Sequence, residues 1–149
     1  MHFSLDEFTK SRTAIQFGID NTPNEEQINN LERLVRAVLN PVRVMYKHPI
    51  IVNSGFRSPA LNKKVNGQPD SQHLTGQAAD VQTAGDKDNR KLFELLSQMD
   101  FDQLIWEYGD DEKPDWIHVS YVSNEKNRHC ILRSKKLNKK TIYLPFKLK

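Results

Sequence analysis

The chain has 149 residues, of which 28% are charged and 37% hydrophobic, and its formal net charge is +3 at pH 7. This length suffices for one domain with its own hydrophobic core, and the ordinary composition argues against disorder outside the basic segment 133–149, which we expect to be partly disordered. No apolar run reaches the roughly 18 residues that a membrane span needs. The start MHFSLDEFTK has an acidic pair and no apolar segment, so we do not expect it to act as a secretory signal.

The first third of the chain is predicted to be helical. Residues 1–23 have a capping-box spacing near their start, which predicts one short helix followed by a turn-rich loop. Asn24 begins the longest helical pattern, in which apolar residues recur every three or four positions. Pro41 is expected to kink or break this helix, with a second helical piece ending near Lys47.

The remainder mixes short helices with segments typical of strands. Ser58 followed by Pro59 has the pattern of a helix start and predicts a helix to about Val65. Another helix is expected over residues 86–98. Strands are expected at residues 50–53, 76–82, 103–108, 116–122, 129–133 and 142–144. Helices first and strands mostly later favour an α+β fold, with helices packed on a largely antiparallel central sheet, in a single domain over residues 1–149.

Two segments carry residues suited to metal chemistry. His73 and Asp80 lie seven positions apart in SQHLTGQAAD, and His118 lies in DWIHVSY. The single cysteine, Cys130, excludes a thiolate zinc cluster, so a metal must be bound by histidines and carboxylates. Two histidines and one carboxylate form a catalytic zinc site that leaves a fourth position to water. Zinc lowers the pKa of such a water to about 7.

A hydrolytic site also needs a base and a positive group for the oxyanion. Asp115, three residues before His118, is the first candidate base, and Glu107 in LIWEYG is the second, or a residue that orients a ligand. Arg57 in SGFRS is the candidate oxyanion stabiliser. Strict strand alternation would place Asp115 and His118 on opposite faces, so the strand must begin after Asp115 or bend there.

Together these motifs resemble the zinc D-alanyl-D-alanine peptidase family. The similarity consists of S-x-H-x6-D at Ser71, His73 and Asp80, followed by D/E-x-x-H at Asp115 and His118. FSLDEFTKS, GIDNTP and SGFRS extend it over most of the chain, in the small single-domain branch. The family includes wall-processing carboxypeptidases, dipeptidases of vancomycin resistance and phage L-alanoyl-D-glutamate endopeptidases, and it shares its fold with the Hedgehog signalling domain.

The resemblance implies a role for each matching residue. His73, Asp80 and His118 would bind one zinc ion. Asp115 would be the catalytic acid and base, where many relatives have glutamate, and Arg57 would steady the substrate carbonyl and the tetrahedral intermediate. Ser71 would contribute to substrate binding or to a hydrogen bond behind the ligands.

These expectations define one main hypothesis and two alternatives. The main hypothesis is a monomeric zinc peptidase that cleaves peptidoglycan stem peptides at the bacterial cell wall, made without a readable signal. The first alternative is a non-catalytic, zinc-stabilised binding or structural domain of the same fold, which would need neither Asp115 nor Arg57. The second is a nucleic-acid-associated protein, but the basic segment 133–149 lacks interleaved aromatic residues, so no specific nucleic-acid binding is expected.

Overall fold

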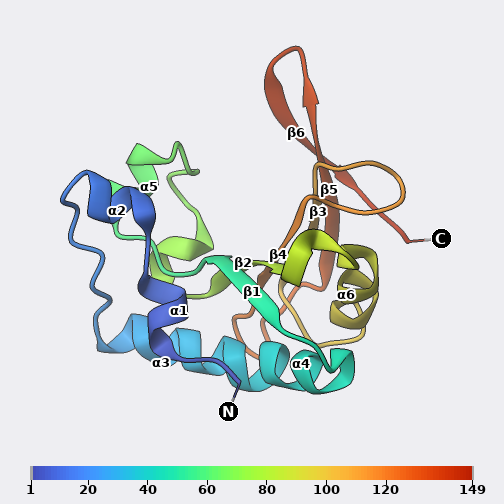
Figure 1. Cartoon of the computed structure of the whole chain (residues 1–149), viewed down its shortest axis with the longest axis horizontal. Helices are drawn as coiled ribbons and strands as arrows, with labels where there is room; N and C mark the ends of the chain where they lie inside the picture. Colours follow the sequence, from blue (N-terminus) through green and yellow to red (C-terminus); the bar gives the residue numbers. More distant parts are fainter. Residues whose placement is uncertain (1, 149) are drawn as a thin grey trace.

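The computed structural model describes residues 2–148, which form a six-stranded sheet with helices packed against it (Figure 1). The strands are β1 (Ile50–Ser54), β2 (Ala78–Thr83), β3 (Gln103–Glu107), β4 (Trp116–Ser120), β5 (Cys130–Leu137) and β6 (Lys140–Pro145). Their order across the sheet is β1-β2-β4-β3-β5-β6. Only β3 and β5 pair in parallel among these strands, so the predicted α+β fold with a largely antiparallel sheet is confirmed.

Helices precede the sheet and connect its strands. The helical segments are α1 (Leu5–Thr9), α2 (Arg12–Gln16), α3 (Glu25–Leu34), the π-helical turn η1 (Val35–Leu39), α4 (Asn40–Tyr46), α5 (Pro59–Lys64), the 3-10 turns η2 (Gln72–Thr75) and η3 (Ala84–Asp86), and α6 (Asn89–Leu96). No helix within residues 2–148 is both long and apolar enough to cross a membrane.

One face of the sheet forms the hydrophobic core. Val81, Ile117, Val119 and Leu104 are fully buried there and pack in one cluster with the apolar residues of α3, η1, α4 and α6. Because side chains alternate along a strand, the residues between them project from the other face. The core therefore occupies one face of the central strands, and polar residues are available on the other.

Of the two expected outcomes at Pro41, a break does not occur, and the expected second helical piece is α4, which ends at Tyr46, near Lys47. The π-helical turn η1 comes directly before Pro41, and the backbone N–H of Asn40 bonds to the carbonyl of Val35, five residues back. This wider turn accommodates a proline ring that would clash with the carbonyl of the preceding turn in a regular α-helix, and Pro41 then lies at the start of α4.

The N-terminal segment contains two helices where one was predicted. Ser4 and Glu7 form the expected capping box at α1. Ser11 caps α2 by accepting a hydrogen bond from the backbone N–H of Ala14. This second cap makes residues 12–16 helical, where the sequence led us to expect loop.

The basic segment expected to be partly disordered contains a hairpin. Strands β5 and β6 pair from Leu132 with Pro145 to Leu137 with Lys140, which leaves a two-residue loop. Asn138 and Lys139 in that loop both have positive φ, as the favoured type I′ hairpin turn requires. We call β5 and β6 together the C-terminal hairpin; its tip projects from the body of the molecule (Figure 1).

Candidate active site

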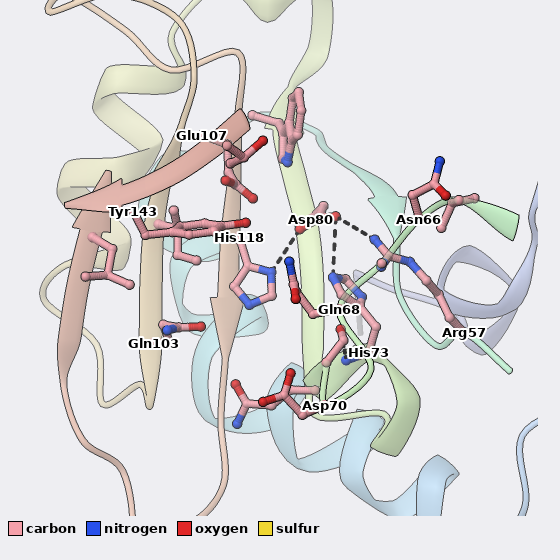
Figure 2. A pocket seen from close by; sticks show the side chains of 18 of the residues that line it. Arg57, Asn66, Gln68, Asp70, His73, Asp80, Gln103, Glu107, His118 and Tyr143 are labelled. Atoms are coloured by element: carbon pink, nitrogen blue, oxygen red, sulfur yellow. Dashed lines mark hydrogen bonds and ion pairs between the residues drawn. The ribbon is translucent and has the colours of Figure 1, made fainter. Parts of the chain in front are cut away.

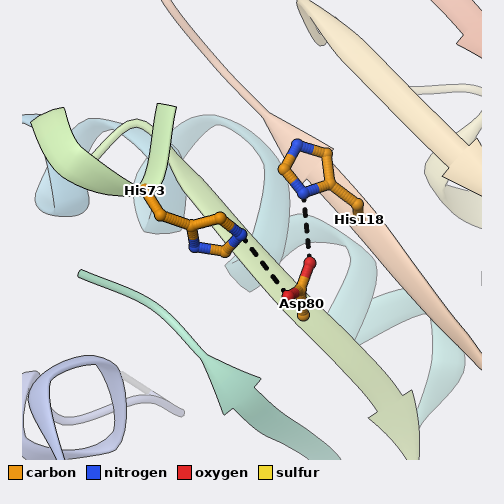
Figure 3. Close-up of side chains that lie close together, drawn as sticks. All are labelled: His73, Asp80 and His118. Carbon is orange, nitrogen blue, oxygen red and sulfur yellow. Dashed lines mark hydrogen bonds and ion pairs between the residues drawn. The ribbon is translucent and has the colours of Figure 1, made fainter. Parts of the chain in front are cut away.

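The three predicted metal ligands come together on the polar face of the sheet. His73 lies in η2, Asp80 in β2 and His118 in β4, and all three are buried. Asp80 stands directly opposite His118 in the pairing of β2 with β4, so both side chains project from the same face. One ligand atom from each residue lies within 4.8 Å of the others. Figure 3 shows this ligand cluster, in which both imidazole rings face the carboxylate of Asp80.

The turn η2 positions His73. At its start, the hydroxyl of Ser71 accepts a hydrogen bond from the backbone N–H of His73 at 3.2 Å. At its end, Gly76 has a φ of 76°, and a Cβ atom there would lie 2.4 Å from the backbone oxygen of Gln27. Only glycine fits both constraints. Ser71 thus caps the turn that carries His73, and a direct role in substrate binding stays a prediction.

The hydrogen bonds of the ligand cluster suit a bound cation. Nδ1 of His73 lies 2.7 Å from the carbonyl oxygen of Gly55, which can only accept, so Nδ1 carries a proton. Nε2 of His73 faces Asp80 Oδ2 at 3.4 Å, and Nδ1 of His118 faces Asp80 Oδ1 at 3.1 Å. A carbonyl behind an imidazole is the usual arrangement for a metal-binding histidine. The cluster therefore fits a metal such as zinc.

Asp80 is held in its ionised form. Burial would raise the pKa of this carboxyl, but the charges and hydrogen bonds of His73 and His118 outweigh burial and hold the pKa well below its usual range. An ionised carboxylate is the form that binds a metal.

Arg57 lies beside the ligand cluster, as predicted, and is well anchored. Its Nη2 is 3.3 Å from Asp80 Oδ2. Its Nε bonds to the hydroxyl of Ser54 at 3.1 Å, and its Nη1 bonds to Asn62 Oδ1 at 3.2 Å. Its backbone N–H donates to the carbonyl of His73. The guanidinium is thereby fixed at the rim of the cluster, where it can contact a molecule bound in front of the three residues.

An open cleft of about 620 Å³ lies over the ligand cluster (Figure 2). One wall is the loop of residues 65–72, which contributes Asn66, Gln68 and Asp70. The other wall is formed by β3 and the C-terminal hairpin. The cleft is lined mainly by hydrogen-bonding side chains.

The structure brings Glu107, and not Asp115, to this cleft. Strand β4 begins at Trp116, so Asp115 precedes it, as the alternation argument required. The side chain of Asp115 is nevertheless exposed and is not among the described residues that line the cleft. Glu107 is buried, lines the cleft and pairs with Trp116 across β3 and β4, which places it on the same face as His118. The sequence ranking of the two carboxylates does not match their positions.

Glu107 has the environment of a general base. Its Oε1 accepts a hydrogen bond from the hydroxyl of Ser134 at 2.6 Å. Burial raises the pKa of Glu107, the hydrogen bond from Ser134 lowers it, and the charge of Asp80 raises it, with a net rise. A carboxylate whose pKa is shifted towards neutrality is a better proton acceptor.

Sequence reasoning missed the contribution of the C-terminal hairpin to the cleft. Leu132, Thr141 and Tyr143 from the hairpin line it, together with Tyr108 at the end of β3. The pairing of β5 with β3 is parallel and joins distant segments, and no motif signals it. The sequence signals were the expected strands at residues 129–133 and 142–144, which did not indicate the partner of either strand.

Comparison with known proteins agrees with this arrangement. A family model described as Peptidase M15 matches residues 1–120, most of the chain. The match contains all three residues of the ligand cluster, Arg57 and both candidate bases, and it ends at the last residue of β4. None of the curated proteins matches the chain.

Proposed function

This chain belongs to the Peptidase M15 family, and we propose that it is a zinc-dependent peptidase that hydrolyses peptide bonds in the stem peptides of bacterial peptidoglycan. The observation that carries the proposal is the buried ligand cluster on the floor of an open cleft, with Glu107 and Arg57 at its edges. A purely structural zinc site is closed by a fourth protein ligand and needs neither a base nor an oxyanion donor.

His73, Asp80 and His118 are the residues that would hold the metal. Zinc, when bound, lowers the pKa of water and polarises a carbonyl group. The protein orients its ligands for this task through the carbonyl of Gly55 behind His73 and through Arg57 beside Asp80.

Glu107 is the proposed general base. It accepts the proton of the attacking water and then donates it to the nitrogen of the leaving amine, so the carboxylate ends the cycle as it began. The hydrogen bond from Ser134 holds one of its oxygens, and the residue lines the cleft beside His118. We assign this role to Glu107 in place of Asp115 because only Glu107 lines the cleft.

Arg57 is the proposed oxyanion donor. Its anchors at Ser54 and Asn62 hold the guanidinium in place before substrate binds. Such preorganised donors stabilise the negative charge that develops on the carbonyl oxygen as the amide is attacked. The resemblance to wall-processing peptidases supports the substrate class, and the D-Ala-D-Ala and L-Ala-D-Glu bonds are the candidates for cleavage.

The proposal is tested with the full chain and defined muropeptides. We expect one zinc ion per chain by elemental analysis, and mass spectrometry should show a muropeptide split at a single amide bond. Chelation should abolish cleavage, and added zinc should restore it. A correctly folded, zinc-loaded protein that cleaves neither muropeptides nor purified peptidoglycan would refute the proposal and favour a non-catalytic zinc-stabilised domain.

A further inference from the structure

The C-terminal hairpin lies outside the family match, yet it borders the cleft. The match ends at residue 120, whereas β5 and β6 run from Cys130 to Pro145. Tyr143, near the end of β6, is one of the residues that line the cleft. The hairpin therefore contributes groups to the site that the family motifs do not include.

Strand register places Tyr143 on the face of the sheet that carries the ligand cluster. Glu107 pairs with Ser134 across β3 and β5, and Ser134 pairs with Tyr143 across β5 and β6. The hydrogen bond between the side chains of Ser134 and Glu107 shows that these two share one face. Directly paired residues project from the same face of a sheet, so Tyr143 shares it too.

The side chain of Tyr143 points into the cleft. In Figure 2 its hydroxyl ends in the space between Glu107 and His118, and no dashed line joins it to another residue of the view. The residue is 45% exposed, so a ligand in the cleft can reach it. Burial raises the pKa of the Tyr143 phenol, and the charge of Glu107 raises it further, so the phenol stays protonated and can donate a hydrogen bond.

The hairpin is attached to the sheet beside Tyr143. The hydroxyls of Tyr108 and Thr141 are 2.7 Å apart, which links the end of β3 to β6. The backbone N–H of Tyr108 bonds to Ser134. The ring of Tyr108 also packs against Trp116, with ring centroids 5.3 Å apart. These contacts hold Ser134, which pairs with Tyr143, and Thr141, two positions before Tyr143 on the same strand, and they thereby hold Tyr143 at the cleft.

We propose that Tyr143 contacts substrate and that its phenol donates a hydrogen bond to the carbonyl oxygen of the scissile peptide. This inference rests on the proposed peptidase function. Arg57 follows β1, at one edge of the sheet, and Tyr143 lies in β6, at the other, so the two donors approach the ligand cluster from opposite sides (Figure 2). Together they would hold the carbonyl oxygen between a charged and a neutral donor, and the neutral donor would come from the hairpin.

The test compares zinc-loaded wild type with Tyr143→Phe, which keeps the ring and removes the hydroxyl. Tyr46→Phe, which removes a hydroxyl remote from the cleft, is the matched control. We expect Tyr143→Phe to lower kcat on the muropeptide about 10- to 100-fold with KM nearly unchanged, because the bond strengthens as charge develops on the oxygen. Zinc content and melting temperature should match those of wild type.

A binding measurement provides a readout that does not depend on turnover. Phosphinic analogues of D-Ala-D-Ala and L-Ala-D-Glu mimic the tetrahedral geometry, and calorimetry should show about 10-fold weaker binding of the preferred analogue to Tyr143→Phe than to wild type or Tyr46→Phe. An active wild type with an unchanged Tyr143→Phe variant, or a variant that changes only KM, would overturn the role of Tyr143 alone. A wild type that neither cleaves nor binds would overturn the peptidase function and this inference with it.

Discussion

The two sides of the cleft are built in different ways. On one side, the ligand side, the three residues that would bind metal are almost fully buried. Gly55 and Ser71 position His73, and Arg57 contacts Asp80. On the hairpin side, Tyr143 is half exposed and comes from a segment beyond the family match. Metal binding requires ligand atoms at fixed separations, whereas a substrate wall needs only to present donors and surfaces of suitable shape. The metal-binding groups therefore belong to the ligand side, whereas the hairpin side adds groups such as Tyr143 that a molecule in the cleft can reach.

Glu107 joins the two sides, and its replacement has the largest expected effect. Glu107→Gln keeps the size of the side chain but cannot accept the proton, so kcat should fall about 10²- to 10⁴-fold while zinc binding is retained. Asp115→Asn is the matched control, because Asp115 is exposed and outside the cleft; its kcat should stay within about 3-fold of wild type, since it contacts no reacting group. Steady-state kinetics and zinc analysis of both variants provide the measurement. Loss of activity in Asp115→Asn with retention in Glu107→Gln would restore the original ranking.

Gly76 tests how tightly the ligand side is built. Gly76→Ala would add strain at a φ of 76° and a Cβ atom 2.4 Å from the backbone oxygen of Gln27. The free energy of unfolding should fall by about 2–4 kcal/mol, and zinc affinity should weaken because η2 carries His73. Gly18→Ala is an informative control: Gly18 has a similar φ of 63° but nothing within 4 Å of the added atom. Gly18→Ala should lower the free energy of unfolding by only about 1 kcal/mol, which is the cost of the strained backbone conformation alone.

Urea denaturation of both glycine variants measures the difference. Equal losses of stability would mean that the backbone around Gly76 and Gln27 shifts easily to make room for the added Cβ atom. The ligand side would then be no more rigid than an exposed turn. A larger loss for Gly76→Ala would show that the close contact between the backbones of Gly76 and Gln27 holds η2 rigidly in place.

The sequence predicted the ligand side far better than the hairpin side, for physical reasons. His73, Asp80 and His118 are recognisable because their spacing is set by one short turn and one strand pairing, and the structure brings them together. The choice between Glu107 and Asp115 depends on where β4 begins and on its register with β3, which the loop at residues 108–115 does not reveal. Alternation along the strand had already pointed to the difficulty with Asp115.

Expectations about the fold failed where a local feature of the structure departs from the usual rule. At Pro41, where a kink or a break was expected, a π-helical turn relieves the clash and the helix continues. Asn138 and Lys139 form a type I′ turn without the glycine that normally marks one, so the C-terminal hairpin resembled a solvated basic segment. Parallel pairing of β5 with β3 joins segments that are not adjacent in sequence, and local patterns carry no information about such a partner.

Ser134 provides the subtlest test, because it acts on the base from the hairpin side. If Glu107 is the general base, as proposed, it acts in its ionised form, and activity should fall as pH drops through its raised pKa. The hydrogen bond from Ser134 favours the ionised form and lowers this pKa. Ser134→Ala should therefore raise the pKa further and move the acidic limb of the kcat/KM profile to higher pH, with a modest change at the optimum. Ser97→Ala, at the end of α6, should leave the profile unchanged. If the limb stays in place or moves to lower pH in Ser134→Ala, either Glu107 is not the titrating base or the C-terminal hairpin does not tune it.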